Sequence, residues 1–224
     1  MTTSPRNELT WEKVPHNFPE PSSHKTNDVS VLRSWHSSLS PSEDQLLCWT
    51  ERPRGLPLLL KYEKGDLKSA IACDGQIGED IMANVVMMRG VHRQVPRSFT
   101  GSIYGDIFIT YEMLRHFPAH REPLSAVLDA SRRVGREDAR VCQYLTVKCY
   151  DLSQSFRTEA EKFFFLKGLD LMTPNHGFWI TIEEAVHLTT EYKKTLSNEM
   201  NYEIEGLLFT AGQDTAPLLV TFQD

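Results

Sequence analysis

Residues 55 to 109 constrain the fold more than any other part of the chain. This stretch opens with an apolar run, Gly55 to Tyr62, which breaks at Glu63-Lys64-Gly65-Asp66 and resumes from Leu67 to Cys73. Two apolar runs joined by a short segment that contains glycine are typical of a β-hairpin. We therefore expect a hairpin of buried strands at the centre of the fold.

A dense polar loop follows this hairpin. Asp74-Gly75 and Gly78-Glu79-Asp80 stand between the hairpin and a short apolar segment, Ile81 to Met88. At a strand-to-helix junction of this kind, backbone N–H groups can face a ligand. The sequence therefore predicts that any binding chemistry lies near this loop.

Composition and length favour one globular domain. The chain has 224 residues, of which 40% are hydrophobic and 24% are charged, as in ordinary globular proteins. Residues 1 to 30 are rich in Pro, Ser, Asn and His, and we expect an extended N-terminal arm there, followed by a folded domain over residues 31 to 224. The formal charge of −6 argues against a dedicated DNA clamp.

Neither a membrane span nor a secretion signal is expected. The longest apolar run, Leu56 to Leu60, is far too short to cross a bilayer, and the N-terminus has no apolar signal segment. These features predict a cytoplasmic protein. The four cysteines show no CxxC pair and the eight histidines no paired spacing, so we expect small buried hydrophobic cysteines and no metal site.

Local signals place the other elements. Capping boxes predict helices that begin near Ser40, Thr158 and Thr181, the first of them running through Leu47 and Trp49. The second helix should bury Phe163, Phe164 and Leu166. Further expected elements are a strand pair over Phe99 to Ile109, a short helix over Tyr111 to Phe117, a helix with a basic loop over Ala119 to Arg140, a central strand over Tyr144 to Tyr150, and strands over Tyr202 to Phe209 and Leu218 to Phe222.

Four segments, taken in order, resemble the adenylation domain of bacterial NAD-dependent DNA ligases. The segments are Gly55 to Leu67, Asp74 to Val85, Tyr104 to Phe108 and Tyr202 to Leu208, and their family counterparts are the KxDG, DGxxGEDxxxNV, GE(V/I)F and YEIDGVVIK motifs. The resemblance covers residues 29 to 222. It implies an α+β fold of the nucleotidyltransferase or ATP-grasp-like type, in which antiparallel sheets and flanking helices enclose a central cleft.

The chain departs from this family at the position of the reactive lysine. Counting back from Gly55 places Arg52 there, and Arg54 replaces the aspartate of the motif. A guanidinium group stays protonated and offers no lone pair, so it is not expected to attack a phosphate. We therefore assign no catalytic residue. A role in DNA repair or replication is what the resemblance alone implies.

The residues that would contact phosphate in the family are replaced as well. Ala72 replaces an arginine, Thr210 replaces a lysine, and the last five residues contain no lysine; Asp106 stands at the position of the family's strand glutamate. Such groups stabilise the charge that develops during phosphoryl transfer. What remains is a possible relict pocket for NAD or ATP, with no cofactor required; its candidate residues are Arg52, Asp74, Glu79, Asp106 and Glu205.

These replacements favour a catalytically degenerate homologue that acts as a binding module for a protein partner or for DNA. The candidate contacts are the arginines of the most basic segment, Arg121, Arg132, Arg133 and Arg136. Two alternatives stay open: a nucleotidyltransferase or NAD-dependent DNA ligase component whose site is altered or completed by a partner chain, and a nucleotide sensor without chemistry. Residues 1 to 30 leave no room for the family's small N-terminal domain, so a complete ligase is not expected.

Each candidate also has a purely structural interpretation. Glu79, Asp80 and Asn84 are suited to capping and turn formation at the polar loop. Asp106 fits an outward-facing strand residue equally well, and Glu205 fits a residue that helps to define the fold. The arginines are suited to a solvated surface.

Overall fold

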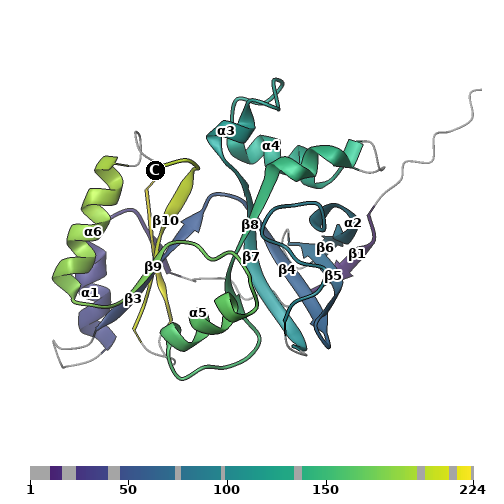
Figure 1. The fold of residues 1–224 in the computed structure, drawn as a ribbon. Coiled ribbons are helices and arrows are strands. Elements are labelled where there is room, and N and C mark those ends of the chain that lie inside the picture. Colours follow the sequence, from purple (N-terminus) through teal and green to yellow (C-terminus); the bar gives the residue numbers. More distant parts are fainter. Residues whose placement is uncertain are drawn as a thin grey trace, which may run out of the picture.

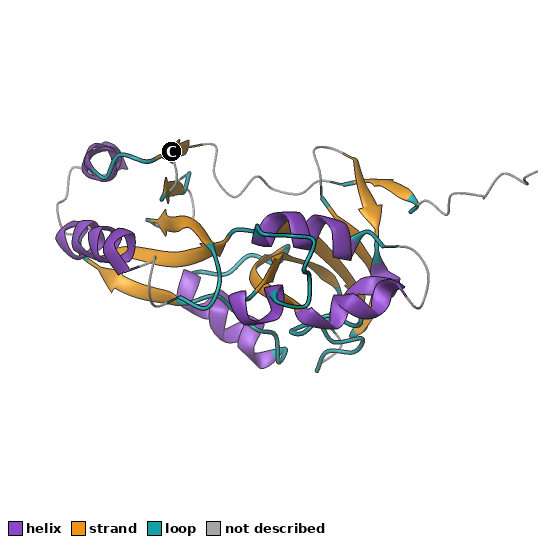
Figure 2. Ribbon diagram, turned by 90° about the horizontal axis from the view of Figure 1, so that it is seen from above, coloured by secondary structure: helices purple, strands orange, loops and turns teal. Residues whose placement is uncertain are grey.

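Two β-sheets that lie side by side form the frame of the protein (Figure 1). The structure, a computed structural model, describes residues 11–16, 24–39, 46–73, 77–96, 99–133, 138–195, 200–211 and 216–222. Helices flank both sheets (Figure 2). The expected α+β architecture with antiparallel sheets is therefore confirmed.

The larger sheet has six strands, and each neighbouring pair is antiparallel. In spatial order the strands are β1 (Lys13–Pro15), β6 (Ile77–Asp80), β5 (Asp66–Ala72), β4 (Leu56–Glu63), β7 (Gly101–Ile109) and β8 (Leu145–Leu152). The predicted hairpin is confirmed as β4 and β5, whose turn places Lys64 and Gly65 at φ values of 52° and 90°.

The smaller sheet has five strands. In spatial order they are β2 (His24–Thr26), β11 (Leu218–Thr221), β10 (Ile204–Thr210), β3 (Leu47–Pro53) and β9 (His176–Ile180). Strand β2 runs parallel to β11, and the other pairs are antiparallel. Strands β1 and β2, both within residues 1 to 30, thus add one edge strand to each sheet.

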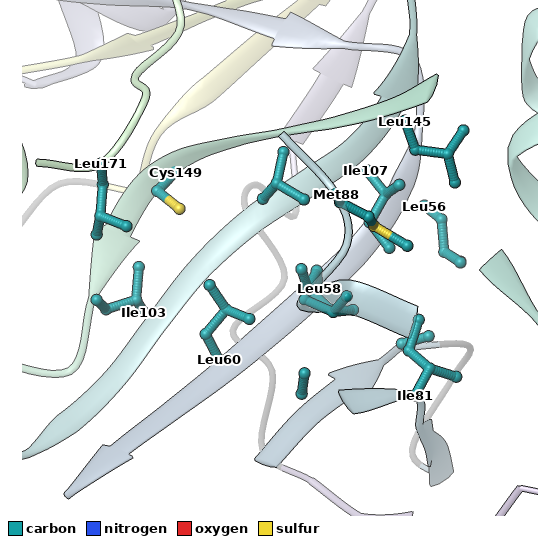
Figure 3. Close-up of a cluster of buried hydrophobic side chains, with 14 of the residues drawn as sticks. Leu56, Leu58, Leu60, Ile81, Met88, Ile103, Ile107, Leu145, Cys149 and Leu171 are labelled. Carbon is teal, nitrogen blue, oxygen red and sulfur yellow. The ribbon is translucent and has the colours of Figure 1, made fainter. Parts of the chain in front are cut away.

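The main core lies on one face of the six-stranded sheet (Figure 3). Alternate residues of β4 point into it, because side chains alternate between the two faces of a strand. Leu58 and Leu60 are fully buried there, together with Ile103 and Ile107 of β7. Burying one such side chain contributes about 1.5–3 kcal/mol, so this apolar face is the main source of the sheet's stability.

The helices begin largely where the local signals predict. The helical segments are α1 (Ser30–Leu39), α2 (Met82–Val85), α3 (Tyr111–Leu114), α4 (Pro123–Ser131), the 3₁₀ segment η1 (Asp138–Tyr144), α5 (Glu159–Gly168) and α6 (Ile182–Thr195). The capping boxes at Thr158 and Thr181 are confirmed: each hydroxyl accepts a hydrogen bond from the backbone N–H three residues later, at 3.1 and 3.2 Å. No helix in the described ranges is long and apolar enough to cross a membrane.

One predicted helix is wrong. Its capping box at residues 40–43 lies outside the described residues, but Leu47 and Trp49 belong to strand β3. This strand pairs with β10 on one side and with β9 on the other. Hydrogen bonding to two strands that are distant in the sequence outweighs a local helix signal.

Three smaller expectations also need correction. Residues 101–109 form one long strand, β7, rather than a pair. Strand β8 lies at the end of its sheet, not at the centre; its outer edge is covered by other segments, with Val147 N–H bonded to the Arg89 carbonyl and Cys149 N–H to that of Met172. Phe164 is 71% exposed, because it points away from the face of α5 that buries Phe163 and Leu166.

Candidate functional site

An ion pair joins the two sheets where they meet. Arg52 of β3 and Asp106 of β7 are only 3% and 2% exposed, and Nη2 of the arginine lies 3.0 Å from Oδ2 of the aspartate. The guanidinium also lies over the ring of Tyr150 from β8, 4.0 Å from its centroid. Arg52 is therefore held on both sides by residues of the six-stranded sheet.

The surroundings keep this arginine charged. Burial is the largest single influence on Arg52 and opposes its charge, but Asp106, Tyr150 and Glu205 together outweigh burial and raise the pKa of the guanidinium. Burial raises the pKa of Asp106 to about 6, against the attraction of Arg52, and the nearby charge of Glu205 acts in the same direction as burial. Arg52 is thus a permanent cation that cannot act as a nucleophile or a base.

A second buried hydrogen-bond network centres on Glu51, the residue before Arg52. Glu51 is fully buried, and its carboxylate accepts hydrogen bonds from the hydroxyl of Tyr202 at 2.5 Å, the hydroxyl of Tyr192 at 2.9 Å and the side-chain amide of Asn175 at 2.9 Å. Tyr202 accepts in turn from the amine of Lys148 at 2.6 Å. Burial lowers the pKa of this amine, while the charge of Glu51 works to raise it.

The alternation of strand β3 explains why there are two networks. Neighbouring residues of a strand point to opposite faces, so Glu51 and Arg52 enter different surroundings. Each network nevertheless links the same two sheets, through Asp106 of β7 in one case and Lys148 of β8 in the other. Sequence reasoning missed Glu51, Lys148 and Tyr202; the available signal was a charged residue inside an otherwise apolar strand.

A cleft of about 580 Å³ opens beside these networks. Tyr150 contributes to its lining, and Thr50 of β3 and Thr210 of β10 contribute from the five-stranded sheet. Among the described residues, one lysine lines it: Lys162 of α5. Its amine lies 2.7 Å from Glu159 and 3.4 Å from Asp151, which line the cleft as well. Arg157 lines the cleft too, so the lining carries two acidic and two basic side chains.

The predicted pocket residues are spread over several places. Arg52 and Asp106 are brought together, and Glu205 acts on Asp106 through its charge while forming an ion pair with Lys25 of β2 at 3.1 Å. Glu79 lies on β6, which β5 and β4 separate from the strand of Asp106. Asp74 lies outside the described residues. None of the four described candidates, Arg52, Glu79, Asp106 and Glu205, lines the cleft of about 580 Å³.

The residues of the polar loop have structural partners. Asp80 accepts hydrogen bonds from the backbone N–H groups of Met82 and Ala70 at 3.0 and 3.2 Å. The amide of Asn84 donates to the carbonyls of Ser131 and Arg133 at 2.8 and 2.7 Å. These contacts tie α2 to the sheet and to the end of α4, so the structural interpretation of Asp80 and Asn84 is confirmed.

The basic segment is partly neutralised. Arg132 pairs with Glu79 at 3.0 Å, and Arg133 pairs with Asp129 at 2.6 Å. Arg121 is exposed just before α4, and Arg136 lies outside the described residues. Two of the predicted contact arginines thus already hold acidic partners in the protein.

The cysteines behave as predicted at three of four positions. Cys73, Cys142 and Cys149 are buried, and Cys48 is half-buried. Burial raises the pKa of the Cys142 thiol to about 12, so this group is not a thiolate at neutral pH. In the ranges that the structure describes, no three His, Cys, Asp or Glu side chains gather as they would to hold a metal ion.

Comparison with known proteins relates the chain to ligases. No protein-family model matches it. It is 28% identical to a DNA ligase of Sorangium cellulosum and 25% identical to one of Treponema denticola, in each case over 88% of this chain and 33% of the relative. A DNA ligase of Leptospira interrogans is 22% identical over 88% of this chain and 30% of the relative. The chain thus spans about a third of the length of these relatives.

A solved structure shares the fold. An archaeal ATP-dependent RNA ligase superposes with a TM-score of 0.55 at 14% identity, covering 93% of this chain and 49% of that one. At this identity the likeness concerns the fold alone. Together with the DNA ligase relatives, it supports a ligase-type nucleotidyltransferase domain as the relationship of this chain.

Proposed function

We propose that this domain does not adenylate itself and that it acts as a binding module. The observation behind this proposal is the state of Arg52, a buried cation fixed between Asp106 and the ring of Tyr150. Attack on a phosphate needs a neutral amine with a free lone pair. In the NAD-dependent ligases that the chain resembles, this position supplies the amine. Here it holds an arginine in a structural ion pair.

Two other lysines near the cleft are poor substitutes. Lys162 forms ion pairs with Glu159 at 2.7 Å and with Asp151 at 3.4 Å. Lys148 is buried and donates to the hydroxyl of Tyr202. Both amines already have partners within the protein, which supports a module without ligase chemistry.

Intact-mass measurement tests this proposal. The purified protein is incubated with NAD, and separately with ATP, in the presence of magnesium. We expect no covalent increase in mass. The matched variant is Arg52→Lys, which restores an amine at this position; we expect it to stay unlabelled too, because the other cations of the family pattern are absent. An adenylyl group on the wild-type chain would overturn the proposal.

A nucleotide sensor is the second candidate. Its support is the cleft of about 580 Å³, a volume within the usual range for small-molecule sites. A sensor would gain thermal stability with NAD or ATP, following RT ln(1 + [L]/Kd), without any change in covalent mass. A melting temperature that is unchanged at millimolar ligand would leave the binding module as the better assignment.

A protein partner fits this module better than DNA. The formal charge of the chain is −6, and Arg132 and Arg133 are already paired with acidic residues. Binding to DNA draws most of its affinity from cations that contact phosphates.

A further inference from the structure

Strand β9 carries an irregularity at the edge of the five-stranded sheet. In its pairing with β3, Ile180 faces Leu47 and Gly177 faces Trp49. Two residues of β9, Phe178 and Trp179, therefore stand opposite a single residue of β3, Cys48, which lies between Leu47 and Trp49. An extra residue of this kind is a β-bulge, which bends a strand and redirects a side chain.

The bulge holds Trp179 in an unfavourable backbone conformation. Its φ is 60°, in the left-handed region that costs a non-glycine residue about 1–2 kcal/mol. Lys64 and Asp170 are the other described non-glycine residues with positive φ, and both lie in turns, where this conformation is common. Trp179 is the one that lies inside a strand. Such strain, once observed, is a reason to look for a function of the residue.

The side chain of this strained residue lines the cleft. Trp179 is 64% exposed and lines the cavity of about 580 Å³, as does Leu46, which is 45% exposed. Leu208 and Pro217 add further apolar lining, while Gln154, Ser155 and Thr158 line the cavity with polar groups. The cleft thus combines an exposed aromatic surface with several hydrogen-bonding side chains.

The charges and the strand geometry restrict what can bind there. The lining holds two acidic side chains, Asp151 and Glu159, and two basic ones, Arg157 and Lys162. Because these formal charges balance, the cleft suits an uncharged group better than an ion. The bulge interrupts the regular row of backbone groups along β9, and bulges of this kind protect sheet edges from pairing with another strand. A partner is therefore expected to bind through side chains rather than by adding a strand.

We propose that the mouth of this cleft, around Trp179 and Leu46, is the docking site of a protein partner that inserts an uncharged apolar side chain. This inference rests on the proposed function as a binding module and names the contact that the module uses. Tryptophan is enriched among the residues that dominate binding energy at protein interfaces. A backbone of phosphates gains little from this lining, because its acidic residues, Asp151 and Glu159, offset its basic residues, Arg157 and Lys162.

Peptide selection tests the proposal with a defined probe. A phage-displayed library of linear peptides is selected on the full chain, and the enriched peptides are synthesised for titration. We expect uncharged sequences with an aromatic or large aliphatic anchor. The variant Trp179→Gly should weaken their binding by at least about tenfold, the loss expected for an interface residue of this kind.

Two controls separate binding from folding. Phe164→Ala removes a similarly exposed aromatic, at 71% exposure, which does not line the cleft, and it should leave the affinity unchanged. Trp179→Gly relieves the backbone strain, since glycine adopts positive φ readily. Its melting temperature should therefore not fall, so weaker binding by this variant reports a lost contact.

Several results would overturn the proposal. These are the absence of enriched peptides, equal binding by the wild type and Trp179→Gly, tighter binding of random-sequence oligonucleotides than of peptides, or self-association that Trp179→Gly abolishes. Such results would leave the absence of adenylation standing. Conversely, an adenylyl group found by mass would overturn the proposed function while the peptide measurements remained interpretable on their own.

Discussion

The core of the six-stranded sheet and its junction with the five-stranded sheet bury different kinds of side chain. The core is apolar, with Leu58, Leu60 and Ile107 fully buried. The junction instead buries four charged side chains, each at most 9% exposed: Glu51, Arg52, Asp106 and Lys148. One region is held together by burial of apolar surface and the other by compensated charge.

The two regions should respond differently to substitution. An apolar site that is made smaller loses contacts and leaves a cavity. A buried ion that loses its partner keeps the full cost of its removal from water. The junction should therefore tolerate single changes least, although replacing a whole ion pair by apolar side chains can be neutral.

Asp106→Ala should have the largest effect. It leaves Arg52 buried without its carboxylate, and breaking a buried pair typically costs about 3–5 kcal/mol of unfolding free energy. Urea denaturation measures the loss. The exposed pair of Asp66 and Lys68 provides the control, because Asp66→Ala should change stability little. Similar losses in the two variants would contradict the buried pairing.

Leu58→Ala should have the next largest effect. Leu58 is fully buried at the centre of the main core, and such a truncation costs about 2–5 kcal/mol through lost burial and cavity formation. The same denaturation experiment measures it. A loss well above that of Asp106→Ala would reverse the expected order of the two regions.

Tyr202→Phe should cost less. It removes one hydroxyl that joins Lys148 to Glu51, and leaving buried polar groups without a partner costs about 1–3 kcal/mol. Tyr192→Phe is the matched control, since that hydroxyl contacts Glu51 alone among the described bonds; its loss should be smaller. Equal effects would show that the contact with Lys148 adds nothing.

The pH dependence of stability sharpens the comparison further. The pKa of Asp106 is raised from 3.8 to about 6 in the folded protein, so the native state binds its proton more tightly than the unfolded state. This contribution to stability is present below about pH 4 and is lost as the pH rises through about 6. The unfolding free energy of wild type minus that of Asp106→Asn should therefore fall over this range. A difference that does not change with pH would contradict the raised pKa, and Leu58→Ala should keep the wild-type slope.

Turn and capping motifs in the sequence predicted the elements whose structure depends on residues close together in the chain. The turn at Lys64 and Gly65 and the capping boxes at Thr158 and Thr181 form where glycine geometry and side-chain hydrogen bonds favour them. Strand β3 was missed because its state depends on β9 and β10, which are far away in the sequence. Its own residues give no strong strand signal.

The site was predictable only in part for the same reason. Arg52 and Asp106 were candidates from their positions in motifs, but they are 54 residues apart and belong to different sheets, so their pairing followed only from the fold. Glu51 and Tyr202 are 151 residues apart. No periodicity within either segment indicates that one side chain will accept a hydrogen bond from the other.

The coupling energy between Arg52 and Asp106 tests the central claim most directly, namely that Arg52 is held in a buried structural ion pair with Asp106. A double-mutant cycle with Arg52→Met, Asp106→Leu and the double variant measures it by urea denaturation. We predict a favourable coupling in the upper part of the range of about 0.5–3 kcal/mol seen for residues in contact. A coupling near zero would contradict the claim, because Arg52 would then be free of Asp106 in solution.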